Sequence, residues 1–173
     1  TPRPGEIALS LERMSGVMDV DSDAMTLTAL AGTPLQTIQA AAQEAGCLFP
    51  LDFGARGSCH IGGAIATNAG GNQVIRFGMA RNLVLGLEAV LADGTIISSM
   101  STMLKNNAGY DLKQLFVGTE GTLGIITRCA LRLYPRLPSR ATALCALNSF
   151  DDAVELLGTS RRHLTTALSA FEV

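Results

Sequence analysis

Glycine is concentrated in one stretch of the chain, from Gly54 to Gly71, where six of the 18 residues are glycine. Glycine suits positions where the backbone turns sharply, or lies closer to another group than a side chain permits. A stretch of this composition makes a poor strand interior and a poor long helix. It therefore indicates either a tight loop or a backbone surface that contacts a ligand. Glycine content alone leaves both interpretations open.

Small and polar residues in this stretch favour a ligand-binding surface. Ser58 is expected to cap a short helix of small residues, whose free N–H groups attract phosphate. Ala64, Ala66 and Ala69 leave space for a flat ring, and Asn68 can donate and accept hydrogen bonds at its polar edge. The sequence contains neither G-x-G-x-x-G after a strand nor G-x-x-x-x-G-K-[ST], which excludes the Rossmann and P-loop nucleotide sites.

A second cluster of small residues, Gly118 to Gly124, leads directly into the apolar run Ile125 to Leu133. The alternation in that run predicts a strand. The cluster before it is either an ordinary turn or a second segment that contacts the ligand, and both interpretations stay open at this point.

The hydrophobic pattern predicts an α+β fold without regular βαβ alternation. Strands are expected at residues 7–11, 26–30, 83–91, 96–97, 125–133 and 141–147, and short helices after residue 33, at 110–116 and after residue 149. Asp93-Gly94 between two apolar runs predicts a hairpin. The helix after residue 33 is expected to start with a Thr33 cap and to end at Gly46. Ser149 is expected to cap the last helix.

The composition excludes several classes of protein. Charged residues make up only 16% of the chain and hydrophobic residues 47%, against about 25% charged residues in typical domains. A large core or a surface normally covered by more of the same protein or by a partner explains this, and we favour the covered surface. The net charge of -2 without a basic cluster argues against nucleic acid as a partner. No apolar run reaches the ~18 residues of a transmembrane segment, and residues 1–5 lack the apolar stretch of a signal peptide.

Four cysteines and two histidines show no spacing typical of a metal site. Cys47, Cys59, Cys129 and Cys145 form no C-x-x-C pair, so reduced thiols in a cytosolic type of compartment are expected. We therefore predict no metal site in this chain.

Six segments in order carry a family resemblance that covers nearly the whole chain. They are residues 50–52 (PLD), 57–63 (GSCHIGG), 66–71 (ATNAGG), 84–88 (VLGLE), 109–116 (GYDLKQLF) and 120–127 (EGTLGIIT). Together they resemble the FAD-binding domain of the vanillyl-alcohol oxidase / p-cresol methylhydroxylase (PCMH) superfamily. Within it, they are most similar to the branch that contains D-2-hydroxyglutarate dehydrogenase, D-lactate dehydrogenase and glycolate oxidase.

The resemblance implies the second subdomain of a PCMH-type FAD-binding domain, with a mixed or antiparallel sheet flanked by helices. Residues 1–137 would form this partial domain, without its N-terminal subdomain. Residues 138–173, after a proline-containing linker from Tyr134 to Pro138, would begin a truncated C-terminal FAD-linked oxidase substrate (cap) domain. The chain by itself is expected to be inactive and to bind FAD weakly or not at all.

The resemblance also implies cofactor-binding residues in three groups. The pyrophosphate and ribityl chain of FAD would lie against Pro50, Leu51, Gly57, Ser58, Ile61, Gly62 and Gly63. The isoalloxazine would lie against Thr67, Asn68, Gly70 and Gly71. The adenosine end would lie against Glu120, Gly124, Ile125 and Ile126. The family often has Asn where this chain has Ala64, and Thr where it has Ala108, so substrate and flavin tuning can differ.

The implied activity is FAD-dependent oxidation of a D-2-hydroxy acid, of the D-2-hydroxyglutarate, D-lactate or glycolate class, to the 2-oxo acid. Alternatives are a reductase or an alkyl-glycerone-phosphate synthase on the same scaffold, or a non-catalytic electron-transfer subunit. FAD would be bound non-covalently, although Cys59 and His60 stand where covalent attachment is conceivable. The catalytic residues are unknown, and a divalent metal would belong only to the downstream domain.

The resemblance further implies partners and a location. The partners would be a small-molecule 2-hydroxy acid and an electron acceptor, which is a quinone, an electron-transfer flavoprotein or a cytochrome. A homodimer is an open alternative. The expected location is cytoplasmic, or the mitochondrial matrix in a eukaryote.

Overall fold

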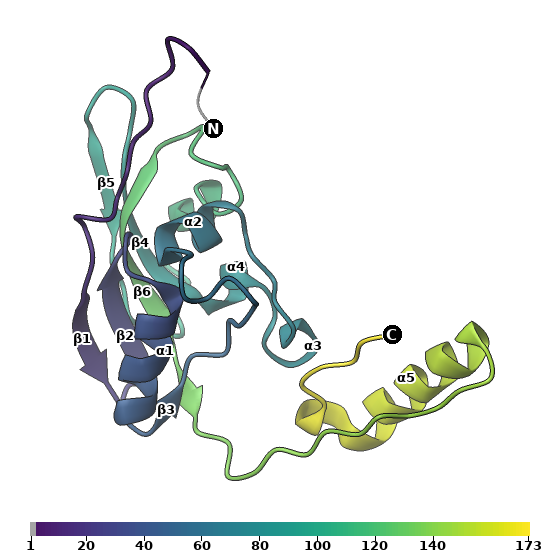
Figure 1. Ribbon diagram of the computed structural model, residues 1–173. Coiled ribbons are helices and arrows are strands. Elements are labelled where there is room, and N and C mark those ends of the chain that lie inside the picture. Colours follow the sequence, from purple (N-terminus) through teal and green to yellow (C-terminus); the bar gives the residue numbers. More distant parts are fainter. Residues whose placement is uncertain (1–2) are drawn as a thin grey trace.

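A computed structural model of the chain describes residues 3–173, so residues 1 and 2 of the first expected domain lie outside the described part. Figure 1 shows a sheet with helices packed on one face and a long C-terminal helix standing apart from it. The sheet has the order β1-β2-β6-β4-β5, and all its pairs are antiparallel. Its strands are β1 Val17–Asp21, β2 Thr26–Leu30, β4 Val84–Val90, β5 Ile96–Ser99 and β6 Ile125–Arg132.

The remaining elements are short, apart from two helices. They are α1 Leu35–Glu44, α2 Ile61–Ala66, α3 Val74–Phe77, α4 Ala80–Leu83, α5 Phe150–Leu164 and the 3-10 turns η1 Leu112–Leu115 and η2 Thr165–Ala167. A second, two-stranded sheet pairs β3 Cys47–Leu48 with β7 Tyr134–Pro135. The α+β class and the antiparallel sheet flanked by helices are confirmed.

The core lies between the sheet and the helices α1 and α2. From the sheet, Leu27 pairs with Leu131, and Leu27 is 1% exposed. From α1, Leu35 and Ile38 are fully buried at 0%, on one face of the helix as their spacing requires. Each such aliphatic side chain contributes about 1.5–3 kcal/mol to folding when it is removed from water. This burial therefore fixes α1 and α2 against the central part of the sheet.

Several local predictions are confirmed. The hairpin turns at Gly94 with φ +86°, and Gly46 ends α1 with φ +74°, a conformation that glycine adopts without a steric penalty. Ser149 caps α5, because its Oγ accepts a hydrogen bond from the N–H of Asp152 at 3.1 Å. The short helix predicted at 110–116 is present as the single 3-10 turn η1.

The predicted strand at residues 7–11 is wrong. These residues form no strand, and the Ile7 side chain is 94% exposed, because the alternating pattern has no neighbouring strand to pair with. The actual edge strand β1 was not predicted, because two of its five residues, in the sequence VMDVD, are acidic and its apolar residues do not alternate regularly.

The predicted Thr33 cap is also wrong. The N-cap position of α1 is Pro34, which has no side-chain hydrogen bond. The Thr33 hydroxyl instead donates to the carbonyl of Leu30 at 2.6 Å, and its oxygen accepts from the N–H of Gly16 at 2.8 Å. Thr33 therefore joins the chain before β1 to the end of β2, which is a long-range role that a local motif does not indicate.

The C-terminal part differs most from expectation. Residues 141–147 form no strand and are all exposed, because no other strand of the described chain lies beside them. The linker predicted at 134–138 begins as β7, which pairs with β3.

Within residues 3–173, no helix is both long and apolar enough to cross a membrane.

Candidate functional site

The helix α2 is anchored to the end of β2 by its first two N–H groups. The N–H of Ile61 donates to the Thr33 carbonyl at 2.9 Å, and that of Gly62 donates to the Ala31 carbonyl at 2.8 Å. The prediction that the helix start offers free N–H groups is therefore wrong for these two residues. The predicted Ser58 cap is wrong too, because His60 is the N-cap residue and the Ser58 hydroxyl donates to the Ala55 carbonyl at 3.3 Å.

The two adjacent glycines of α2 lie in opposite environments. A Cβ atom on Gly62 would lie 2.6 Å from the Cβ of Ala31, whereas a Cβ on Gly63 would meet nothing within 4 Å. The N–H of Gly63 also has no hydrogen-bond partner among residues 3–173. Gly62 is bare because α2 packs closely on β2, and Gly63 presents bare backbone with an unused donor to open space.

Gly63 opens into a cavity of about 660 Å³, which we call the α2 cleft. Its lining is mostly small or apolar, and consists of Leu9, Ser10, Leu11, Ala31, Phe53, Cys59, His60, Gly63, Ala64, Thr67 and Ala69. The segment 9–11, predicted as a strand, thus forms one wall of the cleft as an extended segment. A concave, mainly apolar cavity with a few polar groups is typical of a cofactor site.

The thiol in the cleft is not activated. Burial raises the pKa of Cys59 above its ordinary value, against the lowering effect of hydrogen bonds from the backbone of Leu35 and of Cys59 itself. A thiol with a raised pKa is a poor nucleophile at neutral pH. The cleft therefore favours non-covalent over covalent binding through this residue.

The C-terminal end of α2 is a Schellman motif with Asn68 as its left-handed residue. The N–H of Ala69 donates to the Ala64 carbonyl at 2.8 Å, and that of Asn68 donates to the Ile65 carbonyl at 2.9 Å. Asn68 has φ +50°, which Asn tolerates better than most residues. Its side-chain oxygen accepts a hydrogen bond from the N–H of Arg81 at 3.0 Å. Asn68 thus serves first to end α2. Its side-chain amide is directed toward α4.

The second glycine cluster docks on the same end of α2. The N–H of Gly118 donates to the Ile65 carbonyl at 3.2 Å, and that of Glu120 donates to the Ala66 carbonyl at 2.9 Å. Glu120 has φ +53°. The two clusters are separated by about fifty residues in the sequence and are joined through backbone hydrogen bonds. Such a connection is required if both clusters belong to one site.

Most of the other predicted site residues lie outside the cleft, and several serve internal packing. Pro50 and Leu51 are buried, and a Cβ on Gly71 would lie 2.3 Å from the Asp52 carbonyl oxygen. A Cβ on Gly124 would lie 2.9 Å from the Val90 carbonyl oxygen, so this glycine also serves internal packing. Of the fifteen predicted residues, Gly63 and Thr67 line the cleft itself. Those that do not line it are Pro50, Leu51, Gly57, Ser58, Ile61, Gly62, Asn68, Gly70, Gly71, Glu120, Gly124, Ile125 and Ile126.

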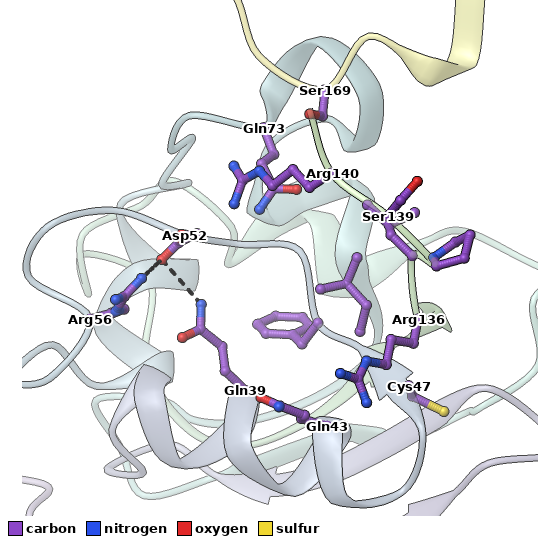
Figure 2. Close-up of a pocket in the computed structure, with 14 residues that line it drawn as sticks. Gln39, Gln43, Cys47, Asp52, Arg56, Gln73, Arg136, Ser139, Arg140 and Ser169 are labelled. Carbon is purple, nitrogen blue, oxygen red and sulfur yellow. Dashed lines mark hydrogen bonds and ion pairs between the residues drawn. The ribbon is translucent and has the colours of Figure 1, made fainter. Parts of the chain in front are cut away.

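A second cavity, of about 480 Å³, lies between α1 and residues 136–140. Figure 2 shows Asp52 at its edge, where its Oδ1 is 2.9 Å from Arg56 and 3.3 Å from the side-chain amide nitrogen of Gln39. The same Gln39 nitrogen donates to the Leu51 carbonyl at 2.8 Å. These contacts hold the loop between β3 and α2 onto α1, and Phe53, Cys59 and His60 of the same loop line the α2 cleft. No group of three or more potential metal ligands occurs within the described residues.

Sequence reasoning missed Arg81 and several residues that line the cleft, which are Leu9, Ser10, Leu11, Ala31 and Phe53. Phe53 lines the cleft, but a single aromatic residue before a glycine-rich loop gives no distinctive signal. Arg81 joins Asn68 to the second cluster, and only the tertiary structure reveals that connection.

Comparison with known proteins shows which family the chain resembles. Residues 2–99 match the FAD binding domain family. The chain is 44% identical over 172 residues to the mitochondrial D-2-hydroxyglutarate dehydrogenase of Bos taurus, which covers 99% of this chain and 32% of that protein. It is 45% identical over 168 residues to the D-2-hydroxyglutarate dehydrogenase of Xanthomonas citri pv. viticola, covering 97% of this chain and 35% of that protein. The chain thus spans about a third of the length of these curated relatives.

A solved structure shares the fold. An alkyldihydroxyacetonephosphate synthase superposes with a TM-score of 0.64 at 23% identity, covering 74% of this chain and 22% of that one. The family match covers more than half of the chain, and the bare Gly63 backbone beside an open cleft fits a bound nucleotide cofactor. The chain therefore belongs to the family of FAD-binding domains, with FAD as its cofactor.

Proposed function

We propose that the whole protein is an FAD-dependent dehydrogenase that oxidises a D-2-hydroxy acid, of the D-2-hydroxyglutarate, D-lactate or glycolate class, to the corresponding 2-oxo acid. The observation that carries this proposal is the identity of about 45% with D-2-hydroxyglutarate dehydrogenases along nearly the whole chain. FAD, when bound, supplies the hydride acceptor for such an oxidation.

This chain's own residues would bind and orient the cofactor. Gly63 offers a backbone N–H with no internal partner and no side chain in the way, and Thr67 lies one turn further along the same open face. The hydroxyl of Thr67 donates to the Gly63 carbonyl at 3.0 Å, so its oxygen can still accept a hydrogen bond. Phe53 and Ala64 add apolar lining to the cleft.

The remaining predicted contacts are part of the same proposal. Glu120, Gly124, Ile125 and Ile126 would approach the adenosine end, mostly through backbone groups, and the bond from Glu120 to the end of α2 supports this placement. Non-covalent binding is proposed, in keeping with the raised pKa of the Cys59 thiol. The boundary after residue 137, the electron acceptor and a cytoplasmic or mitochondrial-matrix location are also proposals. The bovine relative is named as mitochondrial.

Anaerobic mixing of substrate with the FAD-loaded whole protein tests the proposed activity. D-2-Hydroxyglutarate, D-lactate and glycolate are added separately, and reduction is followed as bleaching of the visible flavin absorption band. We expect one of these acids to bleach the band, with the L enantiomer of a chiral substrate as the matched control. If none of the three reduces the flavin, the dehydrogenase proposal fails, while binding of FAD by the cleft is tested separately.

A further inference from the structure

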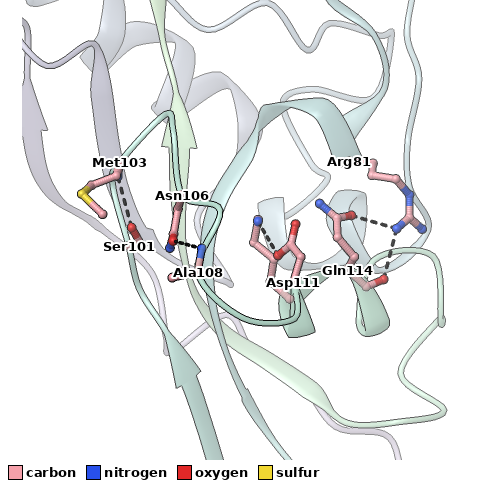
Figure 3. Close-up of polar contacts among 8 residues, drawn as sticks. Arg81, Ser101, Met103, Asn106, Ala108, Asp111 and Gln114 are labelled. Atoms are coloured by element: carbon pink, nitrogen blue, oxygen red, sulfur yellow. Dashed lines mark hydrogen bonds and ion pairs between the residues drawn. The ribbon is translucent and has the colours of Figure 1, made fainter.

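Arg81, on α4, makes hydrogen bonds to two separate segments, the end of α2 and residues 114–117. Its backbone N–H donates to Asn68 Oδ1 at 3.0 Å. One terminal nitrogen of its guanidinium donates to the carbonyl and to the side-chain oxygen of Gln114, at 3.1 and 2.8 Å, and the other donates to the Val117 carbonyl at 2.5 Å. Figure 3 shows the guanidinium turned toward Gln114. A single side chain thus satisfies two main-chain carbonyls more than thirty residues away.

The segment held by Arg81 leads directly into the second glycine cluster. Val117 is followed by Gly118, whose N–H bonds to the Ile65 carbonyl of α2. A Cβ on Gly118 would lie 3.5 Å from both the Arg81 guanidinium and the Cβ of Asn68. The guanidinium therefore lies in the junction between the end of α2 and residues 114–118.

The chain that leads into this junction is only weakly anchored by packing. Between β5 and η1 the chain runs through residues 102–112, all of which are exposed, and η1 has no fully buried residue. Little apolar burial holds this connection in place. At its far end the segment is anchored by Phe116 and Val117, whose side chains are buried in the core. Hydrogen bonds from a charged donor contribute more than neutral ones, so the Arg81 contacts add directional positioning of the backbone at Gln114 and Val117 to that packing.

We propose that Arg81 is a positioning residue of the FAD site, which clamps residues 114–118 onto the C-terminal end of α2 so that both glycine clusters face the cofactor together. This inference rests on the proposed function, since it concerns the same cofactor site. Arg81 acts through Asn68 and the backbone at Val117, without lining the cleft itself. The planar, forked guanidinium is essential, because a Lys ammonium is a single point donor on a flexible chain.

Two variants of the whole protein, Arg81→Lys and Arg81→Met, test the proposal. The dissociation constant of FAD is measured by flavin fluorescence, and folding of the apoprotein by circular dichroism. We expect FAD affinity to fall by about tenfold in Arg81→Lys and further in Arg81→Met, the range that loss of charged hydrogen bonds produces. Arg76→Lys is the matched control. Arg76 stacks on Phe77 at 5.0 Å, and its replacement should leave FAD affinity unchanged.

Chemical rescue separates positioning from general loss of structure. Guanidinium at low millimolar concentration is added to Arg81→Ala and to Arg76→Ala. We expect FAD affinity to recover several-fold only in the Arg81 variant, because free guanidinium can occupy the vacated junction. Wild-type affinity in Arg81→Lys and Arg81→Met, an equal loss in the Arg76 control, or the absence of rescue would each overturn the proposal. If the unsubstituted protein bound no FAD, the proposed function itself would fail.

Discussion

The inner and outer faces of α2 each carry a glycine without a side chain, but for different reasons. On the inner face, Gly62 is fully buried against Ala31 and its N–H is bonded to the end of β2. On the outer face, Gly63 has open space above it and an unused N–H. Adjacent glycines in one helix are thus bare for different reasons: Gly62 allows close packing, and we propose that Gly63 contacts the cofactor. A glycine-rich motif therefore mixes folding and binding requirements, which only the structure separates.

The largest expected effect is on the inner face. Gly62→Ala would place a Cβ atom 2.6 Å from the Cβ and 3.0 Å from the carbonyl oxygen of Ala31. We expect overpacking to lower the free energy of unfolding by about 1–3 kcal/mol, whether FAD is present or not. Urea denaturation of the apoprotein, followed by circular dichroism, measures the change. Unaltered stability would mean that α2 does not pack on β2 as described.

The matched substitution on the outer face should act on binding instead. Gly63→Ala places a Cβ in open space, and Ala favours helix over Gly by about 1 kcal/mol. We expect the apoprotein to be as stable as wild type or slightly more so, while FAD binds about tenfold more weakly, a loss of about 1.4 kcal/mol, because the methyl group enters the cofactor's space. Isothermal titration with FAD measures the difference. Equal affinities would show that FAD does not approach this face.

Asn68 lies just after the C-terminal end of α2, beyond both glycines. Asn68→Ala forces an alanine into φ +50° and removes the acceptor for the N–H of Arg81. We expect it to lower the free energy of unfolding by about 1 kcal/mol. Asn68→Gly keeps the conformation accessible and should cost less. The order of the two urea midpoints tests the assignment, and the reverse order would contradict it.

The smallest effect is expected away from both faces. Glu88 pairs with Arg128 across β4 and β6, and also accepts a hydrogen bond from the Thr127 hydroxyl at 2.8 Å. The hydrogen bond from Arg128 holds the pKa of Glu88 below its ordinary value. A carboxylate with a lowered folded-state pKa stabilises the protein above its unfolded pKa of about 4.3, and this contribution is lost as pH falls through the folded pKa.

Glu88→Gln should therefore cost about 1 kcal/mol or less at pH 7, and the difference from wild type should shrink below about pH 4. Urea midpoints at a series of pH values measure it. FAD affinity should not change, since neither partner lines the α2 cleft. A difference that grows as the pH falls would contradict the assignment.

The sheet was predictable where local pattern and tertiary pairing agree. The run from Ile125 to Leu133 is strongly apolar and becomes the central strand β6, and Asp93-Gly94 forms the expected hairpin. The run at 7–11 has the same alternation without a partner strand. Alternation alone therefore predicts a strand only where a neighbour supplies hydrogen bonds.

The candidate cleft lies in the segment that the sequence indicated, but its lining was not predicted residue by residue. The sequence pointed to the backbone around Gly63, and the cleft lies there. It could not separate Gly63 from Gly62, because their difference depends on the contact of Gly62 with Ala31. It could not find Arg81 either, since its partners lie 33 and 36 residues away in the chain.

A crystal structure of the FAD-bound whole protein tests the central claim most directly. The decisive measurement is the distance from the Gly63 backbone nitrogen to the nearest FAD atom. We predict contact, within about 4 Å, with FAD lying in the α2 cleft between residues 9–11 and the outer face of α2. An α2 cleft filled by other protein segments, with FAD bound elsewhere, would contradict the account.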